Sequence, residues 1–337
     1  MIINTDQFKQ ILETVTLVRN ISGKKENSGC TDNLLFKEKH VFSYNGEVVV
    51  CCPTPFPTSL EGIVPTEALM SFIRKVNDKT MSVEMTEDLL VFRGGKFKAG
   101  ILLESTGQFP KNITTLVDEV EWTKLPTKFG EALDIVSESA ATTPGTVLSF
   151  IQVADESITA CNNFEVTSFS MKGLKNQILI PATAVKNIVR FSPDSIGFSD
   201  KWIFFSNPNG SHLSCRAGTG KYPDVSKLLS NRGKQIEFPE TVDDVLARAD
   251  VFSTMSGDAT DKEVKFIVAD KKFIIRCHGK QGWFEEIIPS TVEKSFSFSI
   301  NPEHLLRVIE YGKKIELTET SIMFRDSNFI HSVSIEK

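Results

Sequence analysis

The sequence predicts an α+β fold made of three copies of one strand-rich domain, each with two helices. Three observations point to it. The chain has 337 residues, too many for one ordinary domain. A helix led by proline recurs at nearly equal intervals, and short strand-like segments fill the sequence between the helices. With 40% hydrophobic and 24% charged residues, the chain can bury several cores.

The proline-led helix is the clearest repeat. Pro65, Pro181 and Pro302 each precede apolar residues at helical spacing. Proline suits the first position of a helix, because its missing N–H would have no partner there. The intervals are 181 − 65 = 116 and 302 − 181 = 121 residues, close to a third of the 337-residue chain. This spacing predicts three copies of one unit.

A second helix opens each third of the chain. Amphipathic patterns cover residues 5–18, 126–139 and 239–252. A turn of the form Thr-Gly-x-aromatic-Pro follows in the first two thirds, and its prolines, Pro110 and Pro223, lie 223 − 110 = 113 residues apart. We therefore expect three domains, at residues 1–121, 122–236 and 237–337.

The segments between the helices are typical of strands. Residues 264–268, 273–277 and 296–300 are rich in β-branched and aromatic side chains. Turn-forming residues separate such segments, as at 44–47 and 269–272. Each third is expected to hold six to eight strands, enough to bury a core of its own.

This layout resembles the bacterial sliding clamp, the β subunit of the replicative DNA polymerase. The resemblance covers the full length, and its most specific carriers are the proline-led helices, the two aromatic-proline turns and residues 247–253. It implies a homodimeric ring of six domains, with sheets outside and helices lining a hole that holds duplex DNA. It also implies a non-enzymatic role in DNA replication, in which the ring tethers the polymerase and confers processivity.

The formal net charge of −5 gives no general attraction to nucleic acid, so a DNA contact has to be local. The opening helices are net acidic, whereas the proline-led helices are net basic. Scattered Lys and Arg suffice for non-specific contacts with phosphates, although they are equally compatible with an ordinary solvated surface. The candidate DNA-binding residues are Arg74, Lys75, Lys186, Arg190, Arg307 and Lys313 of these helices, with Arg19, Lys24 and Lys25 after the first helix.

The resemblance further implies a pocket between the second and third domains that receives short linear motifs of the polymerase and the clamp loader. The family usually has Asp-Gly-His where this chain has Asn162, Asn163 and Phe164, so the sequence departs from the family pattern here and does not predict which motif the pocket prefers. For Val166, Leu228, Val333 and Ile335 the competing interpretation is core packing. The pocket residues that the resemblance implies are Cys161, Asn163, Phe164, Val166, Pro223, Leu228, Val333 and Ile335.

The resemblance also implies the dimer interface. It would join an edge strand of the first domain, near Ile101 and Leu103, to the helix end at Val251 and Phe252 in the third domain. An exposed sheet edge favours pairing with another chain.

No catalytic or metal-binding motif is recognisable in the sequence. The string 218–221 ends in Gly-Lys as a P-loop does, but Tyr222 replaces the required Ser or Thr and Pro223 blocks the helix. Cys277 and His278 are adjacent in a predicted strand and should point to opposite faces. We expect no cofactor, no metal and no enzyme activity.

The chain is expected to be cytoplasmic. Its six cysteines show no disulfide-like spacing, no apolar run is long enough to span a membrane, and the N-terminal residues lack the pattern of a signal peptide. A structural repeat protein, such as a virion or tail component, would share these properties. That alternative does not predict Arg or Lys on the same helix of every repeat.

Overall fold

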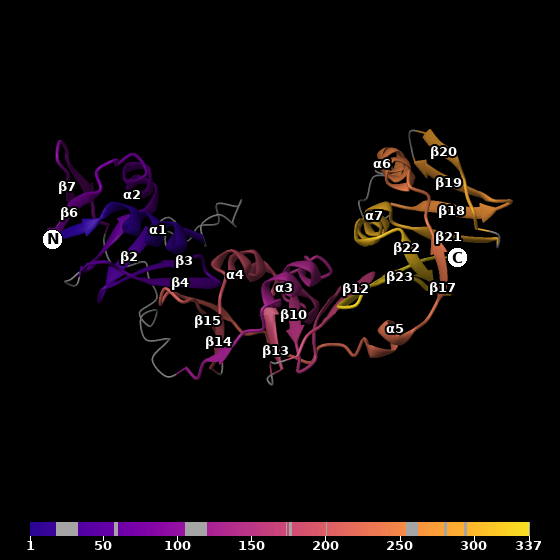
Figure 1. The fold of residues 1–337 in the computed structure, drawn as a ribbon, viewed down its shortest axis with the longest axis horizontal. Coiled ribbons are helices and arrows are strands. Elements are labelled where there is room, and N and C mark those ends of the chain that lie inside the picture. Colours follow the sequence, from indigo (N-terminus) through magenta and orange to yellow (C-terminus); the bar gives the residue numbers. More distant parts are fainter. Residues whose placement is uncertain are drawn as a thin grey trace. The chain divides into compact units, whose positions relative to one another are not determined.

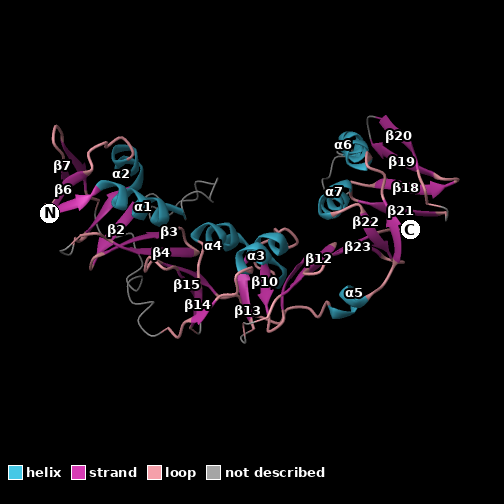
Figure 2. Ribbon diagram, viewed as in Figure 1, coloured by secondary structure: helices cyan, strands magenta, loops and turns pink. Residues whose placement is uncertain are grey.

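The structure is a computed structural model that describes residues 1–17, 33–56, 60–104, 120–172, 174, 177–199, 201–253, 262–279, 282–292 and 295–336. Within these residues it has seven α-helices and twenty-four strands, which confirms the predicted α+β class (Figures 1 and 2). The chain packs as two compact units. Unit 1 comprises residues 1–134, 153–155 and 173–219, and unit 2 comprises 135–152, 156–172 and 220–337.

Unit 1 contains two antiparallel sheets, with strand orders β1-β6-β7-β8 and β5-β2-β3-β4-β16-β15-β14-β9. In the larger sheet, β4 pairs with β16, so strands from the first and second thirds of the sequence form one surface. The strands of this unit are β1 (Ile2–Asn4), β2 (Asn33–Lys37), β3 (His40–Tyr44), β4 (Val48–Pro53), β5 (Gly62–Pro65), β6 (Thr80–Met85), β7 (Leu89–Arg93), β8 (Lys98–Leu102), β9 (Thr123–Lys124), β13 (Ile178–Pro181), β14 (Ser195–Phe198), β15 (Trp202–Ser206) and β16 (His212–Arg216).

Unit 2 contains the four-stranded sheet β20-β19-β18-β21 and a run of strands in the order β10-β11-β12-β24-β23-β22-β17. Here β12 pairs with β24, with Glu165 opposite Val333. The strands are β10 (Phe150–Val153), which starts in this unit, β11 (Ser157–Cys161), β12 (Glu165–Ser170), β17 (Lys234–Glu237), β18 (Val264–Ala269), β19 (Lys272–Gly279), β20 (Gly282–Pro289), β21 (Phe296–Ile300), β22 (Lys314–Leu317), β23 (Ser321–Arg325) and β24 (Phe329–Ser334).

The three predicted proline-led helices are confirmed. Helix α2 (Thr66–Ile73) starts after Pro65, and α7 (Pro302–Tyr311) starts at its proline. Helix α4 (Val185–Phe191) follows Pro181 after one 3₁₀ turn, Ala182–Ala184.

The helices that open each third are α1 (Thr5–Val15), α3 (Phe129–Ser137) and α6 (Val242–Ser253). The predicted starts of the last two, at Pro126 and Pro239, were three residues early. The carbonyl oxygen of each proline accepts a hydrogen bond from the N–H three residues later, so each proline begins a turn before the helix. A short helix, α5 (Ser226–Ser230), was not predicted.

The strand numbering follows the three thirds of the sequence, with β1–β8, β9–β16 and β17–β24 among the described residues. The division into three domains stays a prediction. Its boundary after residue 236 falls inside β17.

In unit 2, α6 and α7 lie side by side next to the strands β18 to β21 (Figure 1). Their apolar faces meet the sheet in a core that includes Leu246, Leu305 and stacked phenylalanines. The rings of Phe266 and Phe298 are 5.0 Å apart and nearly parallel. In the part of the chain that the structure describes, no helix is long and apolar enough to cross a membrane.

Candidate functional site

Four of the predicted DNA-binding residues present exposed charges on the proline-led helices of unit 1. Arg74 and Lys75 lie at the end of α2, and Lys186 and Arg190 lie on α4. Among the described residues, none of the four has an ion-pair partner. Arg74 and Arg190 also share one phase of the repeat, because each lies nine residues after its proline (74 − 65 and 190 − 181).

The two predicted cations of unit 2 are engaged within the protein. Arg307 lies only 307 − 302 = 5 residues after its proline, and the ninth position is Tyr311. Nη1 of Arg307 is 2.6 Å from Oε1 of Glu165 and donates to the backbone oxygen of Glu138 at 2.9 Å. Lys313 pairs with Glu240 and Asp243. Acidic partners already compensate these two charges, so a phosphate would have to compete with those pairs, and DNA binding by Arg307 and Lys313 stays a prediction.

Arg19, Lys24 and Lys25, the remaining predicted DNA contacts, lie outside the described residues.

Glu165 is the centre of a buried polar cluster in unit 2. Its side chain is 1% exposed, and besides Arg307 it meets Nδ2 of Asn162 at 3.0 Å and Nδ1 of His304 at 3.3 Å. Burial by itself raises the pKa of the Glu165 carboxyl. The neighbouring His304, Arg307 and His331 outweigh that effect, and the pKa lies below its ordinary value. The carboxylate is thus kept ionised inside the protein.

The cluster continues along β12 and β24 through neutral groups. Nδ1 of His331 is 2.6 Å from the hydroxyl of Thr167, which lies 2.5 Å from the hydroxyl of Ser139. Burial lowers the pKa of His331 to about 4, with Arg307 and His304 acting in the same direction against the pull of Glu165. His331 is therefore neutral near pH 7, and the network links β12, β24 and the segment after α3.

Phe164, one of the predicted pocket residues, stands on a turn that this cluster supports. The side-chain oxygen of Asn162 accepts hydrogen bonds from the N–H groups of Phe164 and Glu165, at 2.8 and 2.9 Å. The Phe164 ring is 51% exposed and stacks on His304 of α7, with centroids 5.7 Å apart. A fixed, half-exposed aromatic surface results.

The other predicted pocket residues divide by burial. Leu228 on α5 is 52% exposed, Asn163 and Pro223 are exposed, and Ile335 is half-buried. Cys161, Val166 and Val333 are buried, at 5%, 4% and 1% exposure. The burial of Val166 and Val333 agrees with the core interpretation given for them, and all three side chains lie beneath the protein surface.

His304 was missed by sequence reasoning. It stands 304 − 164 = 140 residues from Phe164, and no local pattern connects the two.

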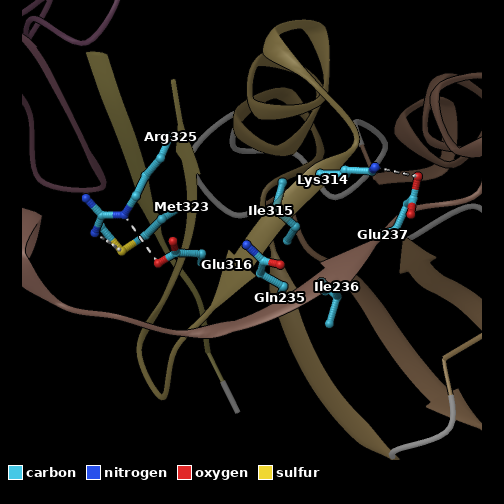
Figure 3. Close-up of a pocket in the computed structure, with 8 residues that line it drawn as sticks. All are labelled: Gln235, Ile236, Glu237, Lys314, Ile315, Glu316, Met323 and Arg325. Atoms are coloured by element: carbon cyan, nitrogen blue, oxygen red, sulfur yellow. Dashed lines mark hydrogen bonds and ion pairs between the residues drawn. The ribbon is translucent and has the colours of Figure 1, made fainter. Parts of the chain in front are cut away.

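A hollow of about 380 Å³ lies over β17, β22 and β23 and contains none of the predicted pocket residues. Its walls carry mutually paired charges, Lys314 with Glu237 and Arg325 with Glu316 (Figure 3).

The predicted interface residues of the first domain differ in exposure from their neighbour Leu102, and their role in a dimer stays a prediction. Strand β8 is at the edge of its sheet, but Ile101 is 9% exposed and Leu103 is half-buried. Because successive side chains of a strand point to opposite faces, Leu102 between them is outward, at 68% exposure.

In unit 2, Val251 at the end of α6 is 57% exposed, whereas Phe252 is half-buried and stacks on Phe284 of β20. Strand β20 is itself an edge strand, and it exposes Trp283. Strand β8 in unit 1 and strand β20 in unit 2 are therefore both sheet edges with an exposed apolar side chain nearby.

The described part of the chain contains no group of three or more His, Cys, Asp or Glu that could hold a metal ion. Cys277 is buried and His278 is exposed, as their adjacent positions in β19 predict.

Comparison with known proteins gives a fold relationship without a close sequence relative. No family model matches the chain, and no curated protein matches it. Solved structures match along the whole length. The DnaN sliding clamp (DNA polymerase III subunit beta) of Pseudomonas aeruginosa, solved with griselimycin bound, has a TM-score of 0.81 at 14% identity, and the match covers 100% of this chain and 99% of that chain.

Two further structures agree. The beta subunit from the DNA polymerase of Streptococcus pyogenes has a TM-score of 0.81 at 15% identity, with 100% and 99% coverage. The DNA polymerase III beta subunit of Thermotoga maritima has a TM-score of 0.78 at 14% identity, with 100% and 98% coverage. This chain therefore has, from end to end, the DNA clamp fold of the bacterial DNA polymerase III beta sliding clamps.

Proposed function

We propose that this chain is a DNA sliding clamp, a homodimeric ring that encircles duplex DNA and tethers the replicative polymerase. The observation that carries the proposal is the match to sliding clamps over 100% of the chain at TM-scores of about 0.8. A ring needs all its domains in order, so a match along the whole chain is more informative than a match to one domain.

The proposed DNA contact is electrostatic and independent of sequence. Arg74, Lys75, Lys186 and Arg190 supply exposed charges from α2 and α4, and Arg19, Lys24 and Lys25 remain candidates. Non-specific binding arises when such side chains neutralise phosphates and release counterions. A few contacts of this kind give a loose grip, which suits a protein that has to slide.

The proposed dimer joins the edge strand β8 of one copy to the edge strand β20 of the other. Exposed strand edges carry unpaired backbone groups and readily accept a strand from a second chain. Leu102 beside the first edge, and Val251 and Trp283 beside the second, supply the apolar surface that would hold the register.

The proposed partner pocket lies in unit 2 and takes short linear motifs of the polymerase and the clamp loader. Phe164 and Leu228 are its exposed apolar walls, with Asn163, Pro223 and Ile335 around them. Half-exposed apolar side chains on fixed backbone are suited to the anchor residues of a peptide, from which such sites draw most of their binding energy.

We propose further that the chain acts in the cytoplasm, without cofactor, metal or catalytic activity. The clamp is favoured over a virion or tail component because Arg74 and Arg190 occupy the same phase of two repeats and are both exposed. A purely structural repeat gives no reason for that coincidence.

The proposal is tested by primer extension with the polymerase of the same genome, its clamp loader and excess competitor DNA, so that each product reports one binding event. Products are expected to lengthen at least tenfold when the chain is added. Products of equal length with and without the chain would contradict the proposed tethering.

A further inference from the structure

The helix that carries Leu228 is too short to be stable without tertiary contacts. Helix α5 has five residues, and helices of this length are not stable alone because nucleation costs more than so few hydrogen bonds return. At its start the N–H of Ser226 donates a local hydrogen bond to Oδ1 of Asp224 at 3.0 Å. An exposed Leu228 on such a helix needs tertiary anchors to stay in one place.

The first anchor precedes the helix. Tyr222 is 5% exposed, and its hydroxyl accepts a 2.8 Å hydrogen bond from the backbone N–H of Cys161 at the end of β11. This bond fixes the chain four residues before Ser226.

The second anchor follows the helix and depends on Arg325 of β23. Its Nη2 donates to the backbone oxygen of Leu229 at 2.8 Å and to that of Asn231. Its Nε donates to Oε2 of Glu316 on β22 at 3.2 Å (Figure 3). The side chains of Arg325 and Glu316 are only 13% and 14% exposed, so water competes little for these bonds.

Glu316 also binds the segment that leads away from the helix. It accepts hydrogen bonds from the N–H of Gly233 and from Nη1 of Arg232, both at 3.3 Å. A Cβ on residue 233 would lie 2.5 Å from the backbone oxygen of Leu317, so the close approach of this segment to β22 requires glycine. Hydrogen bonds thus hold residues 229–233 against β22 and β23.

We propose that Arg325 is a positioning residue for the partner pocket: held by Glu316, it fixes the end of α5 and thereby the place of Leu228. The inference rests on the proposed function, because the partner pocket is part of that proposal. The hydrogen bonds that hold residues 229–233 to β22 and β23 do not depend on it. Arginine suits the task because its planar fork bonds a carboxylate and two carbonyl oxygens at once, which a lysine ammonium on a flexible stem does not reproduce.

The test compares Arg325→Met and Arg325→Lys with Lys262→Met in the full chain. Lys262 is a matched control, because its side chain is 6% exposed, it pairs with Asp250 and Glu303 of the same unit, and it does not touch α5. Hydrogen exchange of residues 226–233 is followed by mass spectrometry, and the affinity for the polymerase of the same genome is measured by titration.

Arg325→Met is expected to speed exchange in residues 226–233 at least tenfold and to weaken polymerase binding about tenfold. Arg325→Lys, which keeps the charge beside Glu316, should recover part of both. Lys262→Met should lower the melting temperature without speeding exchange in this segment. Unchanged exchange in Arg325→Met, or an equal rise in Lys262→Met, overturns the inference.

Leu228→Ala separates this inference from the proposed function. If Leu228→Ala weakens polymerase binding and Arg325→Met does not, the positioning role fails while the pocket stands. If Leu228→Ala has no effect on binding, the pocket assignment fails, and with it the role of Arg325 in positioning a pocket wall.

Discussion

Nη1 of Arg307 lies 2.6 Å from Oε1 of Glu165, joining α7 to β12 through a carboxylate whose side chain is 1% exposed. The pair places a full negative charge in the interior of unit 2, where it survives only because cations and hydrogen-bond donors surround it. Arg307 thus serves the fold, although its residue type and its helix suggested a DNA contact.

Replacing Arg307 by Gln should therefore destabilise unit 2. Removing one partner of a buried pair leaves the other charge uncompensated, which costs about 3–5 kcal/mol. Urea unfolding followed by circular dichroism measures the change in the free energy of unfolding. Lys314→Gln is the control, because Lys314 and its partner Glu237 are 82% and 62% exposed and such surface pairs contribute about 0–1 kcal/mol. Equal destabilisation in the two variants would show that the Arg307 pair is not structural.

The stability of unit 2 should fall as the pH drops from 6.5 toward 4. His331 has a pKa of about 4 in the folded chain against 6.5 as its ordinary value. Between these values the unfolded chain binds the proton and the folded chain does not, so protonation favours unfolding. The slope for this one group is at most about 1.4 kcal/mol per pH unit.

His331→Gln should flatten the pH dependence in that window, as read from urea unfolding at half-unit steps of pH. Glu165 contributes separately, because its lowered pKa gives stability that is lost as the pH falls from the ordinary value of 4.5 through the lower one. A slope between pH 6.5 and 4 that is the same with and without His331 would contradict the assignment.

Reversing Arg74 and Arg190 to Glu should weaken DNA binding and leave the fold intact, since both side chains are exposed and neither has an ion-pair partner among the described residues. The salt slope of binding should fall by about one for every phosphate that the variant no longer neutralises. The control, Lys172→Glu with Lys314→Glu, changes the net charge equally at residues that are 86% and 82% exposed. Fluorescence anisotropy with duplex DNA at several salt concentrations reports the outcome, and equal binding by both double variants would refute the proposed contact.

Leu102→Asp should convert the dimer into monomers, because it places a charge beside the edge of β8. Ile2→Asp is the matched control, since Ile2 is 76% exposed on β1 at the opposite edge of the same sheet, against 68% for Leu102. Sedimentation velocity separates the two species. A dimer that survives Leu102→Asp would exclude this edge from the interface.

Leu228→Ala should reduce processive synthesis at least tenfold. It should change the melting temperature by no more than about a degree, because the side chain is already about half exposed to solvent in the folded chain. Ile2→Ala removes an exposed apolar side chain, 76% exposed, from β1, outside the proposed pocket and dimer interface, and should leave synthesis unchanged. A fall in melting temperature with synthesis preserved would assign Leu228 to packing.

The sequence predicted the elements that local patterns encode. Pro65, Pro181 and Pro302 located three helices, because proline at a helix start acts within a few residues. The same reasoning put Arg307 beside Arg74 and Arg190, although it lies five residues after its proline and they lie nine after theirs. Its partner Glu165 is 142 residues away, and only tertiary packing brings the two together.

The candidate pocket shows the same limit. The exposure of Leu228 and Phe164 and the burial of Val166 and Val333 depend on which face of each strand meets the core. A one-residue change of register reverses that choice, as it did at Ile101 and Leu102. The hydrogen bond by which Arg325 anchors α5 likewise joins it to Leu229, 96 residues away, and no sequence pattern predicts that contact.

The central claim, that this chain encircles DNA, is tested most directly by loading it on nicked circular DNA and then cutting the circle. A ring should remain with the circle through gel filtration at moderate salt and elute separately once the DNA is linear, because it slides off the ends. Equal retention on circular and linear DNA, or retention on neither with the clamp loader present, would contradict the account.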